Sequence, residues 1–454
     1  MHFHLHADQA LLPEGWARDV AITVTDGRIA AVTPGAAPSG DRVPVLLPAP
    51  VNLHSHAFQR AMAGMTERRG NEPRDTFWTW RQVMFRFLDH LTPEDLEAIA
   101  RFVQMEMLEA GYAGVAEFHY LHHQPGGVPY DNRAEMADRI AAAAEATGIG
   151  LTLLPVLYMQ GGCDGRSLAP GQVRFGNDLD GFGALMAGAA EALRPLPPDA
   201  ALGVAPHSLR AVPPTALAEA AAMRPKAPIH MHLAEQVGEV AEVEAALGAR
   251  PVRWLLENAA IDDRWCLIHC TQMEPDETAR LAATGAVAGL CPITESSLGD
   301  GIFDGLRYLQ AGGRFGVGSD SNIRIALSEE LRTLEYSQRL RDRGRAMLAT
   351  QDRSTGRVLF DGAVRGGAQA AGRASGALEP GLWADMLALD GAHVDLEGRQ
   401  GDAVLDAWIF AGDDRMVRRV WSAGRAVVHA GKHVDHDAIT EGYRAMLRRL
   451  RARI

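Results

Sequence analysis

Two histidines, His54 and His56, are separated by one residue and follow an apolar run from Pro44 to Val51. This run predicts a short buried strand, and residues i and i+2 of a strand share a face. Both imidazoles can therefore point at one metal ion, each with a neutral ring nitrogen. Because a lone His-x-His pair also fits two ordinary hydrogen-bonded histidines, the metal interpretation depends on further ligands downstream.

Those ligands are available at the ends of later apolar runs. His232 supplies a third imidazole, with His230 as the alternative, and Asp320 supplies a carboxylate. Three histidines and one aspartate are typical of a catalytic zinc site that still admits a water molecule. Glu235 and His269, which also follow strand-like runs, are then placed to transfer protons.

The elements that must position these residues form a repeating pattern. Apolar, strand-like runs alternate with alanine-rich helical stretches, and the runs cover residues 46–56, 113–120, 150–158, 201–207, 228–233, 265–269, 286–291 and 314–320. Eight such units predict a protein of the α/β class with a (β/α)8 TIM-type barrel. The candidate residues fall at the carboxyl ends of the runs, where such barrels place their chemistry.

Short β-like runs of another kind occur at both ends of the chain. Residues 20–24 and 28–32 predict a hairpin around Asp26-Gly27, and the tail has β-like runs at 384–389, 407–410, 417–421 and 425–429. We expect the termini to build one small β-sandwich beside the barrel. The expected domains are 1–45 for its N-terminal part, 46–376 for the barrel, and 377–454 for the C-terminal part with a last helix.

Composition limits the classes of partner. The chain has 454 residues and a net charge of −12, which argues against binding to a nucleic-acid backbone. No apolar run reaches membrane-spanning length, and the N-terminus lacks a basic segment followed by an apolar one, so we expect a cytoplasmic protein. Four scattered cysteines predict free thiols in a reducing compartment instead of a disulfide framework.

Two segments could cover the site. The first runs from Ala61 to Thr92 and contains Trp80 and Arg81; it is either a lid or a helical hairpin packed on the barrel rim. The second, from Gly161 to Asp180, is rich in glycine and polar residues.

The order His-x-His, His, His, Asp along the predicted strands resembles the amidohydrolase superfamily. The spacing His232-x-x-Glu235, and the lack of a lysine candidate at the end of the fourth strand, resemble its mononuclear deaminase branch. Within that branch, residues 52–64 and 77–81 are similar to the family of formimidoylglutamate deiminases of histidine degradation.

This resemblance implies a site and a reaction. One Zn²⁺ per chain, or another divalent ion, would be held by His54, His56, His232 and Asp320, with Glu235, His269 and Asp320 catalytic. The reaction would be hydrolysis of N-formimino-L-glutamate to N-formyl-L-glutamate and ammonia, in a homodimer that binds neither nucleic acid nor membranes. The implied substrate contacts are Gln59, Arg81, Tyr120, His207 and Arg210.

Alternatives remain for the substrate. The two carboxylates of a glutamate moiety need cationic partners, and Arg81 and Arg210 are the candidates. The rival is a deaminase of a purine or pyrimidine ring such as guanine, cytosine or adenosine, which Trp78 or Trp80 could stack against. The cytidine-deaminase fold is excluded because its Pro-Cys-x-x-Cys signature is absent.

Overall fold

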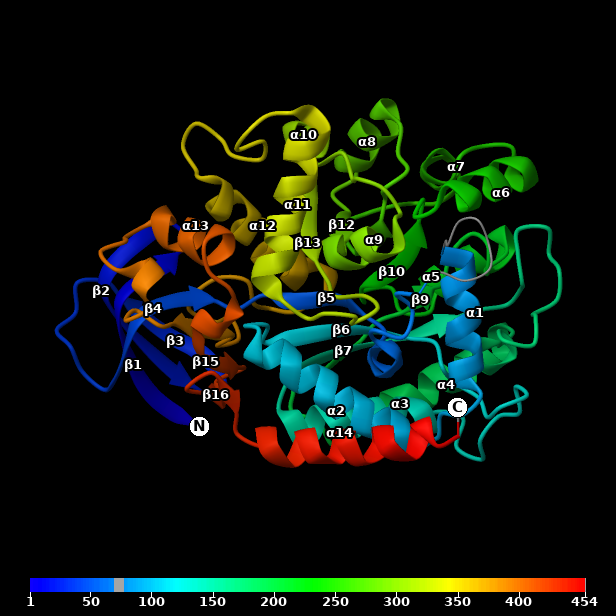
Figure 1. Ribbon diagram of the computed structural model, residues 1–454, viewed down its shortest axis with the longest axis horizontal. Helices are drawn as coiled ribbons and strands as arrows, with labels where there is room; N and C mark the ends of the chain where they lie inside the picture. Colours follow the sequence, from blue (N-terminus) through cyan, green and yellow to red (C-terminus); the bar gives the residue numbers. More distant parts are fainter. Residues whose placement is uncertain (69–76, 454) are drawn as a thin grey trace.

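The computed structural model describes residues 1–68 and 77–453, without the side chains of Phe77 and Trp78. Figure 1 shows a sheet built from the two ends of the chain, in blue and orange-red, beside a larger body of strands and helices. Within the described residues, no helix is both long and apolar enough to cross a membrane.

The described strands of the two termini form one eight-stranded sheet in the order β17-β16-β15-β14-β4-β1-β2-β3. The N-terminal and C-terminal halves meet where β4 pairs antiparallel with β14, while β1 and β4 are parallel. The strands are β1 (His2–Leu12), β2 (Gly15–Thr25), β3 (Arg28–Thr33), β4 (Asp41–Pro48), β14 (Met386–Leu389), β15 (Val417–Ser422), β16 (Arg425–His429) and β17 (Lys432–His433). The sequence-based expectation that both termini share one β structure is confirmed.

The predicted N-terminal hairpin is also confirmed. Strands β2 and β3 pair antiparallel, and Asp26 and Gly27 between them have φ values of 50° and 78°. Two successive positive φ angles are what a tight hairpin turn requires. In contrast, the prediction of a strand at 407–410 is wrong, because these residues end helix α13 (Asp402–Phe410). Its buried Val404, Leu405, Trp408 and Ile409 repeat at helical spacing, which a four-residue window cannot reveal.

The central strands are parallel and follow the predicted order. They are β5 (Val51–Ser55), β6 (Gly114–His119), β7 (Gly150–Leu157), β8 (Ala201–Leu202), β9 (Ala205–Pro206), β10 (Ile229–Leu233), β11 (Trp265–His269), β12 (Val287–Leu290) and β13 (Arg314–Val317). They form one sheet of β5-β6-β7-β8, with β9 also on β7, and a second of β10-β11-β12-β13. Parallel bridges join Ser55 to Asp320 and Val204 to Ile229, so each sheet touches the other at two places.

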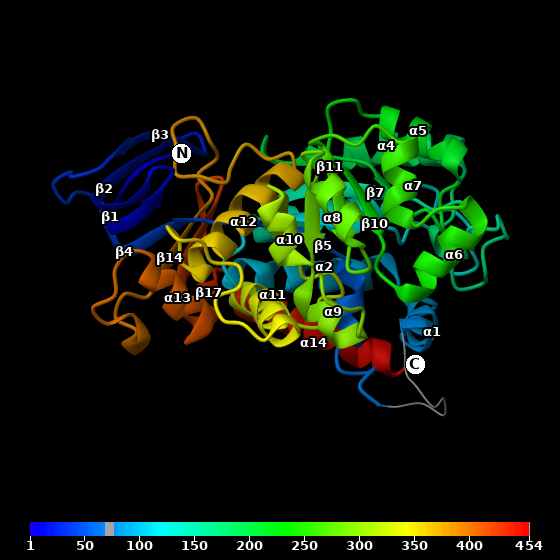
Figure 2. The same cartoon turned by 90° about the horizontal axis from the view of Figure 1, so that it is seen from above.

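Helices lie outside these strands, as the second view shows (Figure 2). They are α1 (Phe77–Leu88), α2 (Pro93–Glu109), α3 (Glu135–Thr147), α4 (Leu179–Ala192), α5 (Pro214–Ala222), α6 (Val237–Leu247), α7 (Pro251–Asn258), α8 (Pro275–Ala282), α9 (Pro292–Leu298), α10 (Gly305–Gln310), α11 (Leu327–Asp342), α12 (Thr355–Ala370) and α14 (His436–Arg451). The last helix packs on α2, where the rings of Phe102 and Tyr443 stack at 4.0 Å. This alternation of strand and helix is the α/β architecture predicted from the sequence.

The strand that carries His54 and His56 differs from the prediction. It begins at Val51, and residues 44–48 belong to β4 of the terminal sheet. Proline 50 lies between the two strands and has no backbone N–H to continue a ladder. Strand β5 is instead tied to β13: Asn52 donates to the Ser319 hydroxyl at 2.6 Å and accepts the Ser319 N–H at 3.1 Å. The histidine pair is therefore fixed directly against the segment that carries Asp320.

Candidate active site

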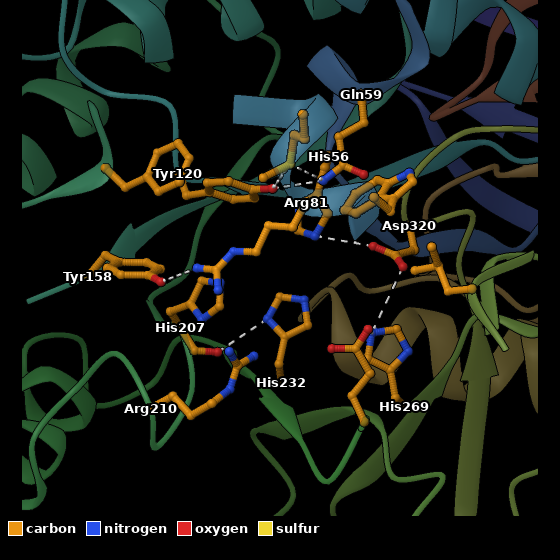
Figure 3. A pocket seen from close by; sticks show the side chains of 15 residues that line it. His56, Gln59, Arg81, Tyr120, Tyr158, His207, Arg210, His232, His269 and Asp320 are labelled. Atoms are coloured by element: carbon orange, nitrogen blue, oxygen red, sulfur yellow. Dashed lines mark hydrogen bonds and ion pairs between the residues drawn. The ribbon is translucent and has the colours of Figure 1, made fainter. Parts of the chain in front are cut away.

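The candidate residues gather at the carboxyl ends of the central strands, around one pocket (Figure 3). Several residues at these ends have left-handed backbone conformations, among them Ala234 (φ 51°), His269 (φ 73°) and Asp320 (φ 45°). Such angles are costly for residues other than glycine, and they persist where the surrounding structure enforces them. The chain therefore accepts local strain to direct the side chains that follow β10, β11 and β13.

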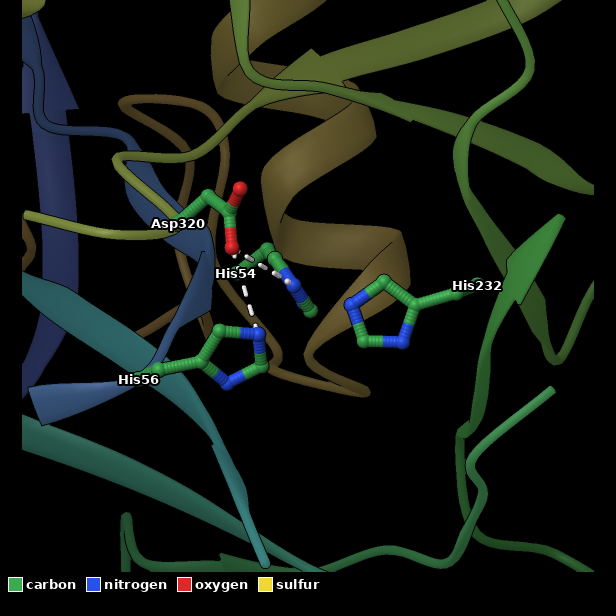
Figure 4. Close-up of side chains that lie close together, drawn as sticks. All are labelled: His54, His56, His232 and Asp320. Atoms are coloured by element: carbon green, nitrogen blue, oxygen red, sulfur yellow. Dashed lines mark ion pairs between the residues drawn. The ribbon is translucent and has the colours of Figure 1, made fainter. Parts of the chain in front are cut away.

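Four of the side chains form a metal cradle, defined as His54, His56, His232 and Asp320 (Figure 4). One ligand atom of each lies within 4.8 Å of the ligand atoms of the others, and all four residues are buried. Asp320 Oδ1 is 3.4 Å from His54 Nε2 and 3.2 Å from His56 Nε2. The spacing suits a single ion placed between the four groups.

The hydrogen bonds of the rings show which nitrogens face the cradle. His56 Nδ1 donates to the Phe118 carbonyl at 2.9 Å, and His232 Nδ1 donates to the His207 carbonyl at 3.2 Å. These bonds leave the Nε2 atoms with their lone pairs, which is the usual arrangement around a metal. Among the described residues, neither ring nitrogen of the buried His54 has a hydrogen-bond partner of acceptable geometry. A buried imidazole without partners is costly unless a ligand completes it, so the cradle fits a metal ion.

The cradle side chains have the protonation states that metal ligands need. Burial lowers the pKa of His54 to about 3 and that of His232 well below its usual value, so both rings are neutral at physiological pH. Burial alone would raise the pKa of Asp320, but its close contacts with the His54 and His56 rings bring it well below its usual value. Two neutral imidazoles and a carboxylate are the forms that bind a divalent cation.

His230, the alternative third ligand, lies outside the cradle. Its Nε2 donates to the Ala370 carbonyl at 2.7 Å, and the group of ligand atoms does not include it. Both histidines of β10 share one strand face, so strand periodicity left His230 as the alternative to the predicted His232. The structure selects His232, which is two residues closer to the carboxyl end.

A second buried group consists of Glu235, His269 and Glu295. His269 Nε2 is 3.8 Å from Glu235 and 3.9 Å from Asp320, and His269 Nδ1 is 3.2 Å from Glu295 Oε1. Burial alone would lower the pKa of His269, but the carboxylates of Glu235, Glu295 and Asp320 raise it to about 10. Burial also raises the pKa of Glu235. The pair Glu235 and His269 can therefore hold and exchange a proton beside the metal cradle.

The five predicted substrate contacts all line this same pocket. They are Gln59, Arg81, Tyr120, His207 and Arg210. Gln59 Nε2 donates to the Tyr120 hydroxyl at 2.7 Å, and Arg81 donates to the Tyr158 hydroxyl at 2.8 Å. The Arg210 side chain is buried; burial alone would lower the pKa of its guanidinium, but nearby acids such as Glu239 leave that pKa raised. The pocket thus joins two guanidinium groups to the metal cradle.

The covering segments predicted from the sequence contribute to the pocket wall. Trp80, Arg81 and Met84 come from α1, and Phe175 comes from the segment between β7 and α4. Residues 69–76 of the predicted lid, and the side chain of Trp78, lie outside the described residues.

Sequence reasoning missed two residues of the site: Glu295, which contacts His269, and Tyr158, which lines the pocket. Glu295 lies in the first turn of α9 and accepts the Cys291 N–H at 2.8 Å as well as facing His269. Tyr158 directly follows β7 and lines the pocket beside His207. Tyr158 had the same signal as the other residues, a polar side chain just after a strand, whereas Glu295 lies inside a helix; neither has a metal-ligand spacing to mark it.

Comparison with known proteins shows to which family the chain belongs. Residues 45–427 match the model of the amidohydrolase family, and residues 1–43 match that of the formimidoylglutamate deiminase HutF, N-terminal domain. A formimidoylglutamate deiminase of Pseudomonas aeruginosa is 50% identical over 441 residues, which cover 95% of this chain and 96% of the relative. A 5-methylthioadenosine/S-adenosylhomocysteine deaminase of Natronomonas pharaonis is 27% identical over 84% of this chain and 82% of its own.

Solved structures agree with these sequence matches. The crystal structure of an amidohydrolase from Brucella melitensis has a TM-score of 0.95 and 48% identity, and the match covers 99% of both chains. The chain belongs to the amidohydrolase family, and its first 43 residues match the N-terminal domain of formimidoylglutamate deiminases.

Proposed function

We propose that this chain hydrolyses N-formimino-L-glutamate to N-formyl-L-glutamate and ammonia, with zinc as its metal, in the degradation of histidine. One observation carries the proposal: a single pocket contains a four-residue metal cradle, a buried acid–imidazole pair and two arginines. The formimidoylglutamate deiminase of P. aeruginosa, whose sequence is 50% identical over 95% of this chain, supports the same substrate.

The donor set supports zinc among the divalent ions. Three imidazoles and one carboxylate, with room for a water, are typical of catalytic zinc sites. When bound, zinc lowers the pKa of a coordinated water toward neutrality and so supplies hydroxide at physiological pH. One ion per chain is expected, because His54, His56, His232 and Asp320 form one cradle.

The side chains around the cradle handle the protons. Asp320 and His269 orient the attacking water and accept its proton, because both face the cradle. A cation held beside Asp320 would offset one of the carboxylates that raise the pKa of His269 and so would favour its neutral form. Glu235 then carries a proton to the departing nitrogen. The water oxygen bonds to the amidine carbon, and both of its protons pass in turn through these side chains to the terminal nitrogen. The C–N bond then breaks as the C=O bond of the formyl group forms, and ammonia leaves.

We assign recognition of the glutamate moiety to the wall of the pocket that carries Arg81 and Arg210. Figure 3 shows the side chains of Arg81 and Arg210 reaching the pocket near His207. Each guanidinium can bind a carboxylate in bidentate fashion, and the two substrate carboxylates give each arginine a partner. The buried Oε1 of Gln59 has no hydrogen-bond partner among the described residues, so it can accept an N–H of the formimino group.

A ring substrate is the less supported alternative. Trp80 lines the pocket and could stack on a ring, but the two arginines Arg81 and Arg210 suit the carboxylates of a glutamate moiety better than a neutral ring. The relative that acts on an adenosine compound is 27% identical, against 50% for the formimidoylglutamate deiminase. The deciding assay measures ammonia release from N-formimino-L-glutamate, guanine and cytosine. Turnover of a ring compound alone would overturn the proposal.

Replacement of Arg210 tests the carboxylate clamp. We expect Arg210→Met to keep the metal and to lower kcat/KM for N-formimino-L-glutamate by roughly thirtyfold to several hundredfold. The physical reason is the loss of a desolvated, charge-assisted bidentate contact worth about 2 to 4 kcal/mol. Arg210→Lys should recover only part of the loss, since a point charge lacks the planar fork.

The control for that variant is Arg307→Met, which removes an exposed arginine outside the pocket. A second comparison uses a formimino compound without carboxylates, because the clamp predicts a fall in the ratio of the two kcat/KM values. If Arg210→Met stayed within about twofold of wild type on N-formimino-L-glutamate, the clamp would lie elsewhere.

Replacement of Glu295 tests its hold on His269. We expect Glu295→Gln to keep the metal and KM but to lower kcat by about 10- to 100-fold, because groups that orient an active-site ring typically contribute this much. Glu330→Gln is the matched control: Glu330 is buried and accepts the Ile293 N–H of the same helix α9, but it does not face His269. Equal losses in both variants would show a general disturbance of α9.

The remaining expectations concern architecture and setting. We propose a closed (β/α)8 barrel over residues 46–376, supported by the parallel bridges at both junctions of the two central sheets. We also propose that residues 1–45 and 377–454 form a β-sandwich, supported by a separate apolar core that includes Leu5, Ile22 and Met386. The protein would act as a cytoplasmic homodimer on a small dianionic substrate, without nucleic-acid or membrane partners.

A further inference from the structure

A buried tyrosine that no prediction assigned stands between the two covering segments of the pocket. Tyr158 is 3% exposed and directly follows β7, and its ring meets that of His207 edge-on at 4.6 Å. Figure 3 shows its hydroxyl directed at the guanidinium of Arg81, which comes from α1. The hydroxyl group therefore lies at the wall assigned above to the substrate carboxylates.

The hydroxyl oxygen accepts two hydrogen bonds. Arg81 Nη2 donates at 2.8 Å, and Gln172 Nε2 also donates at 2.8 Å. The orientation of the Gln172 amide is fixed independently, because its Oε1 accepts the Ala169 N–H at 2.8 Å. Guanidinium and amide N–H groups can only donate, so Tyr158 must be the acceptor in both bonds.

With its oxygen engaged in this way, Tyr158 still has one hydroxyl hydrogen to donate. Among the described residues, no acceptor for that hydrogen lies within hydrogen-bond distance of the Tyr158 oxygen. A buried donor without a partner is costly, and this one lies in the pocket wall. A substrate carboxylate that binds Arg81 would meet the hydroxyl hydrogen of Tyr158 at the same place.

The two bonds also hold Arg81 in place. Gln172 belongs to the segment between β7 and α4, so Tyr158 joins this segment to α1. The two segments are in tight contact, because any side chain on Gly171 would overlap the ring of Phe85 in α1. A long arginine side chain loses less freedom on binding substrate when it is already fixed in its bound position.

We infer that Tyr158 positions Arg81 and donates its hydroxyl hydrogen to the same substrate carboxylate that Arg81 binds. The inference rests on the proposed function and extends it, since it adds a specificity residue and couples the two covering segments through Gln172, Tyr158 and Arg81. It predicts that discrimination for the carboxylates, and not the chemistry at the amidine carbon, depends on this hydroxyl.

The test is the variant Tyr158→Phe, which removes one oxygen atom and keeps the ring. We expect the metal content to stay at the wild-type level and kcat/KM for N-formimino-L-glutamate to fall by roughly 10- to 100-fold, mostly through KM. The ratio of this kcat/KM to that for a formimino compound without carboxylates should fall as well. Tyr308→Phe is the matched control, because it removes another buried tyrosine hydroxyl outside the pocket.

A double-mutant cycle with Arg81→Met tests the positioning role separately. If Tyr158 acts through Arg81, the loss caused by Tyr158→Phe should be smaller when Arg81 is already absent. Gln172→Leu, which keeps the hydroxyl but removes its fixed donor, should give a weaker loss of the same kind. This variant also serves if Tyr158→Phe does not fold.

The outcomes separate this inference from the proposed function. If the wild type does not release ammonia from N-formimino-L-glutamate, the proposed function and this inference both fail. If the wild type is active and Tyr158→Phe stays within about twofold of it, or loses equally on the compound without carboxylates, only the inference fails. Additive losses in the cycle would overturn the positioning role.

Discussion

Removal of the metal is expected to abolish ammonia release from N-formimino-L-glutamate, and added zinc is expected to restore it. The reason is the cradle of His54, His56, His232 and Asp320, whose ring nitrogens and carboxylate face one point. His232→Ala and Asp320→Ala should each leave less than one metal per chain, because a divalent ion held by three ligands is bound more weakly. Metal analysis after dialysis against a chelator, followed by the ammonia assay, measures both effects.

The matched control for the ligand variants is His230→Asn. His230 is a buried histidine of the same strand, but its Nε2 binds the Ala370 carbonyl. This variant should retain one metal per chain even if its stability is reduced. If His230→Asn lost as much metal as His232→Ala, the assignment of His232 as the ligand of β10 would fail. Full activity in a metal-free sample would exclude the zinc mechanism.

The arrangement of the site was predictable because it depends on strand periodicity. His54 and His56 share a face of β5, and polar residues after β10, β11 and β13 meet at one end of a parallel assembly. This rule needs only the strand positions, and the apolar runs give those. The rule left His230 as an alternative to His232, since both share a face; in the structure, His230 is engaged by the Ala370 carbonyl instead.

Other features depend on contacts between distant segments and were not predictable. Glu295 reaches His269 because α9 begins beside the end of β11, and Tyr158 reaches Arg81 because α1 folds over the pocket. Both contacts join residues far apart in the sequence, so no local spacing marks them. The error at 407–410 has a different cause, since a short apolar run fits a buried strand and one side of a helix equally well.

Glu235→Gln is expected to keep the metal and lose turnover. The Glu235 carboxyl is buried beside His269, 3.8 Å from its Nε2, and burial raises its pKa, so it can take up and release a proton. A glutamine has nearly the same shape but cannot carry that proton. General acid–base catalysis contributes about 10²- to 10⁴-fold, and we expect kcat to fall within this range.

Metal content separates this variant from the ligand variants, which should lose metal and turnover together. Glu242→Gln is the control, a glutamate of helix α6, which begins just after Glu235; Glu242 pairs with Arg166 and lies outside the cradle. Because Glu235 lies outside the cradle, its replacement leaves the four ligand groups intact. If Glu235→Gln kept the wild-type kcat with full metal, Glu235 would have a structural role, and proton transfer to the leaving nitrogen would pass to His269.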